Sequence, residues 1–294
     1  DGYFTGFITS SGKVEFWFFV FAVLVFAVIL AGVKNGVERV SRVMMPMMIV
    51  LAVVVAVYSV TRPGAVEGIK YFLIPNLEHF SMMTVVAAMG QMFYSLSIAM
   101  GILYTYGSYI GKEVDIEKST TQVEVFDTGV ALLAGLMIIP AVFAFSGGDA
   151  KTLQAGSALM FITIPKVFAS MGFGTFAGVM FFLLVLFAAL TSSIALTESA
   201  VSTFEDEFGW NRRKSTVIIG VIMLVLGSLS ALGYGSLADV KIIGMQFLDF
   251  FDFLTNTVMM PICRRSKVQF MRSTLRHLRH CRRYWIAAIP APAL

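Results

Sequence analysis

The stretch LFAALTSSIALTES, residues 186–199, places three adjacent hydroxyl residues and an acid inside an apolar run that is long enough for a membrane helix. Thr191, Ser192 and Ser193 interrupt the apolar residues, and Glu198 follows in the same run. Polar and ionisable side chains are costly in hydrocarbon, so they are retained mainly where they face a helix bundle interior or an ion path. The stretch therefore predicts a polar site within a membrane bundle.

The composition of the whole chain agrees with a membrane protein. Of 294 residues, 57% are hydrophobic and 14% are charged, whereas a soluble domain has about 25% charged residues. Apolar stretches of roughly 18 residues or more cross a hydrocarbon core of about 30 Å as helices. The sequence thus predicts an all-α polytopic membrane protein. We expect seven spans, at residues 15–33, 43–60, 83–110, 122–146, 174–204, 216–235 and 242–262.

The two ends of the sequence differ from its middle. The chain opens at Asp1 with neither an initiator Met nor a signal peptide, so we interpret it as a fragment whose residues 1–14 are the remnant of an external loop. Residues 15–262 form the seven-helix part. Residues 263–294 are a basic tail with eight Lys or Arg and no acid; without them the formal net charge of +4 becomes −4. The basic pI therefore gives no indication of nucleic-acid binding.

Three interpretations of the basic tail are open. It is a polybasic arm on the cytoplasmic lipid surface, a helix cut short, or an out-of-frame translation joined after Ile262. The abrupt change of composition at Ile262 favours the last interpretation.

Loop charges predict the orientation of the spans. Basic residues follow the first, third and fifth spans, which places those loops in the cytoplasm. The longer loops 61–82 and 147–173 are then external. Pro165 and several glycines break the apolar part of the second loop, so we expect a folded hairpin there, with an extra interfacial helix as the alternative.

The third span contains small, polar and flexible residues in mid-membrane, in MFYSLSIAMGILYTYGSYI at residues 92–110. An unwound helix segment must face protein or a polar cavity, and such discontinuous helices form substrate and ion sites in transporters. Spacing alone favours the alternative, a continuous helix whose small residues pack against its neighbours.

Two segments resemble the sixth and eighth membrane helices of the neurotransmitter:sodium symporter family: QMFYSLSIAMGILYTYGSYI and LFAALTSSIALTESAVSTFEDEFG. GVKNGVERVSRVMMPMM is similar to the junction of family helices four and five, and FLIPNLEHF to an external loop. The resemblance extends from about residue 15 to Ile262. It implies part of an inverted-repeat bundle of five plus five helices, with a broken helix in mid-membrane. The seven spans match helices four to ten, and helices one to three have no counterpart.

The resemblance implies two sodium sites. Ala188, Thr191 and Ser192 match the carbonyl and hydroxyl ligands of the second sodium, and their i, i+3, i+4 spacing puts them on one helix face. The alternative is that these hydroxyls bond carbonyls of their own helix. Ser95 and Asp127 match ligands of the first sodium, although the family has Asn where this chain has Asp127.

The same resemblance implies the substrate site. Ser95 matches a hydroxyl shared between sodium and substrate, Ser97 lies on the unwound segment, and Tyr94 matches an aromatic lid. Apolar walls match Met100 and Leu196, for which ordinary bundle packing is the alternative. The residues expected to bind substrate are therefore Tyr94, Ser95, Ser97, Met100, Ser192 and Leu196.

An anion site and two gates complete the implied set. Gln91 and Ser95 match the chloride site of chloride-dependent members, but Ala131 stands where those members have a hydroxyl, so we expect Asp127 to supply the negative charge. An acid at the N-terminal end of a helix is the alternative interpretation of Asp127. Asp252 matches an external-gate acid, Asp206 an internal-gate acid and Tyr109 an aromatic residue that supports the internal gate.

The resemblance implies sodium-coupled symport of neutral or hydrophobic amino acids by alternating access, without an enzymatic step or a cofactor. Sodium, an amino acid and the lipid bilayer are the expected partners, and the expected location is a bacterial inner membrane. A passive channel and an intramembrane hydrolase are the alternatives, but the hydrolase lacks a membrane histidine to activate a serine. Because family ligands in the first helix have no counterpart, we expect no coupled transport from residues 1–294 alone.

Overall fold

The computed structural model describes residues 2–75, 80–97, 100–111, 113–147, 159–170 and 172–259. It divides into two units, Asp1–Ala238 and Asp239–Leu294, which are described separately. The regular secondary structure of the described residues is helical, apart from an isolated bridge between Ile242 and Met245. The predicted all-α architecture is therefore confirmed.

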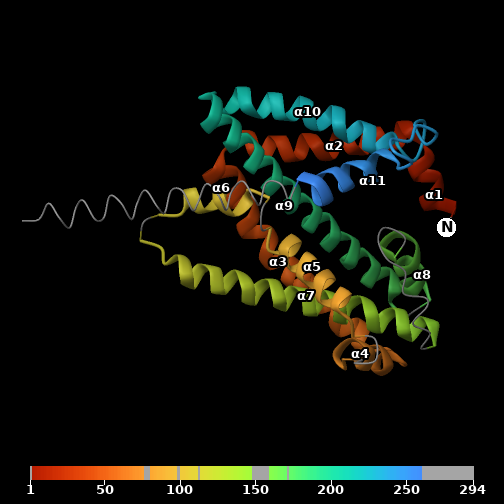
Figure 1. Ribbon diagram of the computed structural model, residues 1–294. Coiled ribbons are helices and arrows are strands. Elements are labelled where there is room, and N and C mark those ends of the chain that lie inside the picture. Colours follow the sequence, from red (N-terminus) through yellow and green to blue (C-terminus); the bar gives the residue numbers. More distant parts are fainter. Residues whose placement is uncertain are drawn as a thin grey trace, which may run out of the picture. The chain divides into compact units, whose positions relative to one another are not determined.

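Five helical segments are long and apolar enough to cross a membrane (Figure 1). They are α2 (Ser11–Leu30), η1 (Val33–Val37) continued by α3 (Glu38–Val60), α7 (Ile116–Ser146), α9 (Gly174–Phe208) and α10 (Arg212–Leu232). They correspond to the predicted first, second, fourth, fifth and sixth spans, but each begins at or before its predicted start. Polar first turns extend two of them, because Asp115 and Asn211 accept backbone N–H groups as N-caps of α7 and α10.

The predicted third span is two separate helices, α5 (Met82–Ser95) and α6 (Ile102–Tyr109). Ser97 and Gly101 have left-handed backbones, with φ of 53° and 85°, which an α-helix does not accommodate. Residues 98 and 99 lie outside the described residues. The broken helix implied by the family resemblance is therefore confirmed, and the continuous-helix alternative is wrong.

The predicted seventh span, residues 242–262, is described only as far as residue 259, and its crossing of the membrane stays a prediction. The described part of this stretch contains only α11 (Phe247–Asp252) and η5 (Phe253–Met259), in the unit Asp239–Leu294. Ile243 and Gly244 form a left-handed turn before these short helices, so the helix begins several residues later than predicted. Residues 260–262 and the whole basic tail lie outside the described residues.

Three shorter elements lie outside the predicted spans. Within residues 1–14, α1 (Gly2–Thr9) is helical, and α4 (Ala65–Leu73) follows the C-terminal end of α3. The loop 147–173 contains η4 (Leu159–Thr163) and α8 (Ile164–Ala169), which together are too short to cross a membrane. The described part of this loop is helical, and the absence of a further crossing stays a prediction.

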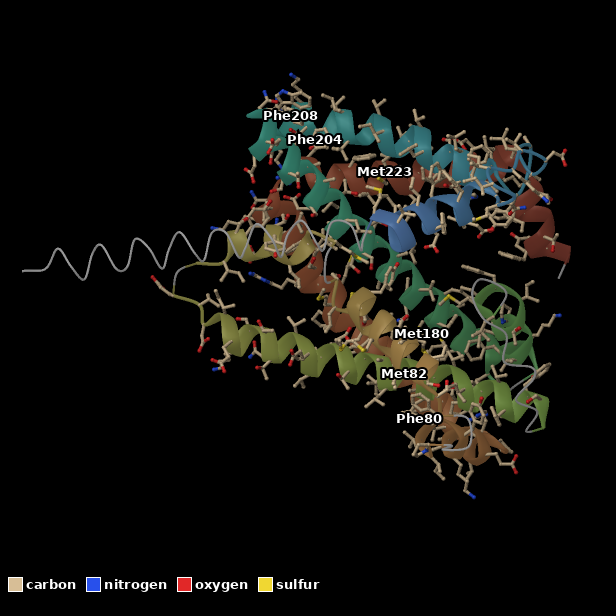
Figure 2. The ribbon with its side chains drawn as sticks, viewed as in Figure 1. Phe80, Met82, Met180, Phe204, Phe208 and Met223 are labelled. Carbon is tan, nitrogen blue, oxygen red and sulfur yellow. The ribbon has the colours of Figure 1, made fainter. Side chains whose placement is uncertain are left out.

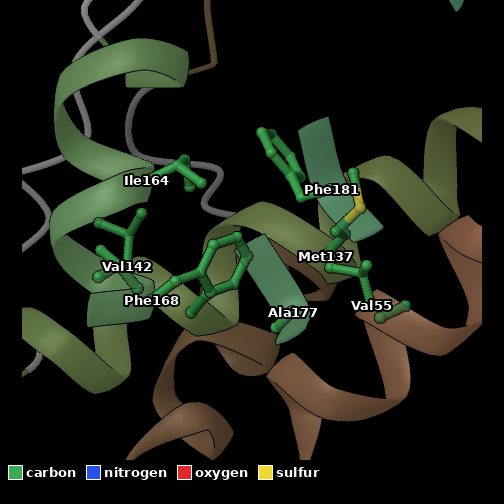
Figure 3. Close-up of a cluster of buried hydrophobic side chains, with 10 residues drawn as sticks. Val55, Met137, Val142, Ile164, Phe168, Ala177 and Phe181 are labelled. Carbon is green, nitrogen blue, oxygen red and sulfur yellow. The ribbon is translucent and has the colours of Figure 1, made fainter. Parts of the chain in front are cut away.

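Two buried clusters hold the unit Asp1–Ala238 together. The first joins α3, α7, α8 and α9, with Val55, Met137, Phe168 and Phe181 among its members (Figure 3). The second joins α2, η1, α9 and α10, and it consists of Val25, Ile29, Val37, Ile194, Val201 and Ile219. Helix α9 contributes to both clusters, so the polar residues of its middle are held between them.

We predict that Phe181→Ala destabilises this unit by about 3 kcal/mol, because the ring is fully buried and its removal leaves a cavity. Phe176→Ala on the same helix is the matched control, since 56% of Phe176 is exposed. Thermal unfolding of the detergent-purified chain measures both variants. Equal midpoints for the two variants would contradict the packing described for α9.

Candidate ion and substrate site

Ser95 and Asp127 meet at the interruption of the broken helix. Ser95 is the last residue of α5, and its Oγ donates a hydrogen bond of 2.6 Å to Oδ1 of Asp127 in α7. Asp127 lies roughly 16 Å along the axis from Ile116, the first residue of α7, given a rise of about 1.5 Å per residue. The N-cap of α7 is Asp115 instead, so Asp127 is not a helix-terminal acid. The structure thus brings together two residues that match ligands of the first sodium.

The matching positions for the second sodium lie on α9, where the hydroxyl of Thr191 bonds its own helix. Thr191 Oγ1 donates to the carbonyl oxygens of Phe187 and Ala188, at 2.9 and 3.1 Å. This is the bonding that the helix-packing alternative requires. The Thr191 hydroxyl gives its hydrogen to these bonds and keeps both of its lone pairs as acceptors. Ser192 is exposed, and the sodium role of all three residues stays a prediction.

The residues matched to the substrate site have exposed or partly buried side chains. Tyr94 is 54% exposed and Leu196 is 51% exposed, while Ser97 and Met100 are partly buried at the interruption. Gln91 precedes Ser95 by one helical turn on α5, and Ala131 follows Asp127 by one turn on α7. Both of these residues are exposed. The binding roles of these residues stay predictions.

The second half of the broken helix, α6, packs on α9. A Cβ added to Gly101 would lie 2.9 Å from Ser199 Oγ, so this position requires glycine for close approach as well as for its left-handed backbone. One turn later, Thr105 Oγ1 donates to Ser199 Oγ at 3.4 Å. These contacts place the interruption beside the polar part of α9.

A buried ion pair lies farther along the contact between α6 and α9. Arg212, the first residue of α10, donates to both carboxylate oxygens of Glu198 at 3.1 and 2.6 Å, and Glu198 is fully buried. Tyr109 Oη of α6 donates to Glu198 Oε1 at 2.8 Å. Arg212 Nε donates to the carbonyl of Ile29 at 3.0 Å. One guanidinium therefore ties α2, α9 and α10 together, and α6 joins through the tyrosine.

The structure gives Tyr109 a hydrogen-bond partner on α9. The resemblance matches Tyr109 to an aromatic residue that supports the internal gate; its hydroxyl bonds Glu198, and Asp206 is exposed. Glu205, the neighbour of Asp206, lies 3.7 Å from Arg212. Asp252 ends α11 in the separate unit. The gate roles of Asp206 and Asp252 stay predictions.

The pairing of Glu198 with Arg212 was not predicted from the sequence. A signal was present, because an acid deep in an apolar helix requires a cation and the first turn of α10 contains three basic residues. Aromatic side chains also mark this turn. Phe204 and Phe208 lie at the end of α9 (Figure 2), and Trp210 stacks on Phe208 and lies near Phe204. Lys214 lies over the Trp210 ring, with Nζ 4.1 Å from its centroid.

Comparison with known proteins places these features in a family. The model of the sodium:neurotransmitter symporter family matches residues 4–282. An uncharacterised sodium-dependent transporter of Bacillus subtilis is 36% identical over 242 residues, which cover 82% of this chain and 53% of that protein. Another, from Haemophilus influenzae, is 30% identical and covers 85% of this chain and 54% of that protein. The chain thus spans about half the length of these relatives.

A solved structure is similar as well. The crystal structure of MhsT in complex with L-phenylalanine superimposes with a TM-score of 0.78 at 36% sequence identity. The match covers 89% of this chain and 59% of MhsT. This likeness confirms the fold class implied by the sequence resemblance.

We predict that Arg212→Ala destabilises the chain by about 3–5 kcal/mol, because it leaves the carboxylate of Glu198 buried and without its cation. Arg213→Ala is the matched control, since the side chain of Arg213 is exposed. The double variant Arg212→Met, Glu198→Met removes both charges and should lose less stability than Arg212→Ala alone. Thermal unfolding midpoints decide the order, and a double variant less stable than the single variant would refute this account of the pair.

Proposed function

The chain belongs to the sodium:neurotransmitter symporter family, and from this we propose that a transporter containing it couples the uptake of neutral or hydrophobic amino acids to sodium. Membership places the chain among transporters and not among enzymes, so the hydrolase alternative is set aside. Five helices long enough to span a membrane agree with this placement.

The contact between Ser95 and Asp127 is the observation that carries the proposal. A hydroxyl and a carboxylate lie 2.6 Å apart at the interruption of a membrane helix. Hard cations prefer oxygen ligands, and a carboxylate within a membrane bundle requires a positive partner. A sodium ion held between Asp127 and Ser95 satisfies this requirement and uses both oxygens as ligands.

The second ion is proposed for Ala188, Thr191 and Ser192. Their oxygens lie on one face of α9, and the Ala188 carbonyl and the Thr191 hydroxyl are already 3.1 Å apart. The solved relative was crystallised with L-phenylalanine, which supports an amino acid as the substrate class here. Met100 and Leu196 then provide apolar contacts for its side chain.

The attachments of the broken helix support alternating access rather than a passive channel. Its outer half, α5, is joined to α7 by the hydrogen bond of Ser95, whereas its inner half, α6, is joined to α9 by Tyr109 and Thr105. Each half thus has a different neighbour, and in the proposed cycle it moves with that neighbour. Ions and substrate bound at the interruption would then couple the two movements.

The test uses residues 15–259 grafted in place of the matching part of the solved relative, reconstituted in liposomes. Thr191→Val with Ser192→Ala should raise the sodium concentration for half-maximal uptake about tenfold, since losing about 1.4 kcal/mol of binding free energy raises Kd tenfold. Ser193→Ala, which removes the adjacent hydroxyl, is the control. Unchanged sodium dependence would show that both hydroxyls only bond within their own helix and do not bind sodium. Uptake by the unmodified graft that ignores the sodium gradient would refute the symport proposal itself.

We also predict that uptake by the same graft does not require chloride. Asp127 supplies a negative charge at the first ion position, and Ala131 offers no hydroxyl for an anion. Uptake should persist when chloride is replaced by gluconate, whereas Asp127→Asn should lower uptake in either salt. Glu124→Gln, at an exposed acid one turn away on α7, is the control. Collapse of uptake in gluconate by the unmodified graft would show that Asp127 does not take the place of the anion.

A further inference from the structure

A third acid, Glu15, lies in a membrane helix far from the residues discussed above. It belongs to the first turns of α2, and Ser228 Oγ of α10 donates a hydrogen bond to its Oε1. The other carboxylate oxygen, Oε2, is buried and has no hydrogen-bond partner among the described residues. An acid oxygen enclosed between two membrane helices therefore lacks a visible donor.

The surroundings of Glu15 form a closed helix contact. One turn earlier on α2, Ser11 Oγ hydrogen-bonds Ser236 Oγ and accepts the backbone N–H of Ser236 at 3.2 Å. On the other side, the Phe18 ring occupies the space that a Cβ of Gly227 would need. Helices α2 and α10 run side by side along their length (Figure 1). Glu15 is thus enclosed by a serine pair at the helix end and an aromatic ring deeper in the contact.

The charged groups of the neighbouring elements do not neutralise Glu15 Oε2. On α2 itself, Lys13 is exposed. The basic residues of α10 are at its opposite end, at least about 20 Å along the helix from Ser228. Three other elements pack against α2 and carry charged or titratable groups. Lys34 of η1 lies beyond the far end of α2, and Tyr3 of α1 is exposed. The acids of α9 lie in its last third, toward Arg212; they are Glu198, Glu205, Asp206 and Glu207.

A carboxylate at such a position is expensive unless a positive charge accompanies it. No side chain on the described elements that pack against α2 provides that charge, whereas a cation from solution can. We propose that Glu15 Oε2, with Ser228 Oγ, binds one sodium ion at the contact of α2 with α10. The bound cation stabilises this helix pair, and the site is separate from the residues of the transport site.

Thermal unfolding of the detergent-purified chain tests the site. Sodium chloride replaces N-methylglucamine chloride at pH 8 and constant ionic strength. The unfolding midpoint of the unmodified chain should then rise about 4 °C more than that of Glu15→Gln, for sodium at about ten times its Kd. Glu67→Gln, at an exposed acid on α4, should respond like the unmodified chain.

Two further variants keep the proposal testable. Ser228→Ala should shift the response to a higher cation concentration. If Glu15→Gln does not fold, this second variant tests the site in its place. The triple variant Asp127→Asn, Thr191→Val, Ser192→Ala removes the proposed transport ligands, and the Glu15-dependent response should persist in it. Equal responses of Glu15→Gln and the unmodified chain to sodium would overturn the proposal. Loss of the response in the triple variant would overturn it too, by assigning the cation to the transport site, whatever the outcome of the uptake experiments.

Discussion

The requirement that every backbone polar group find a partner in hydrocarbon controls this structure, and the interruption between α5 and α6 is where it acts most strongly. A continuous helix satisfies its own N–H and C=O groups, but left-handed residues at Ser97 and Gly101 end that pattern in mid-membrane. The freed backbone groups must face protein, water or bound ions. The Ser95–Asp127 contact at the end of α5 lies at this interruption, and the first sodium ion is proposed there.

Helix α9 makes the interrupted helix possible, because it belongs to both buried clusters and presents polar residues toward α6. Glu198 anchors this arrangement through Arg212 and Tyr109. A buried ion pair adds little net stability over apolar packing, yet breaking one partner is costly. The pair therefore acts mainly to specify how α6, α9 and α10 are placed. Ala188, Thr191 and Ser192 are held on a helix that both clusters immobilise.

The negative charges of three acids in the membrane helices are compensated in different ways. Glu198 has an arginine from the next helix, and its carboxylate is fully satisfied. Asp127 accepts a hydrogen bond from the Ser95 hydroxyl, and its proposed positive partner is an exchangeable sodium ion. Glu15 also has one serine, but its second oxygen is enclosed. A permanent partner suits a structural role, whereas an exchangeable or missing partner suits binding.

The sequence by itself determined the all-helical architecture and the spacing of Ala188, Thr191 and Ser192 on one helix face. These features depend on apolar length and on helical periodicity, both of which are local. The interrupted third span came from the family resemblance, because residue spacing alone favoured a continuous helix. The predicted helix start at residue 242 was wrong, because the turn at Ile243 and Gly244 delays the helix. Only the tertiary structure decided that Ser95 bonds Asp127, 32 residues away, that Tyr109 bonds Glu198, and that Glu15 meets Ser228, 213 residues away. Such contacts depend on how each helix is rotated and packed against its neighbours, and the spacing of residues along one chain does not specify this rotation.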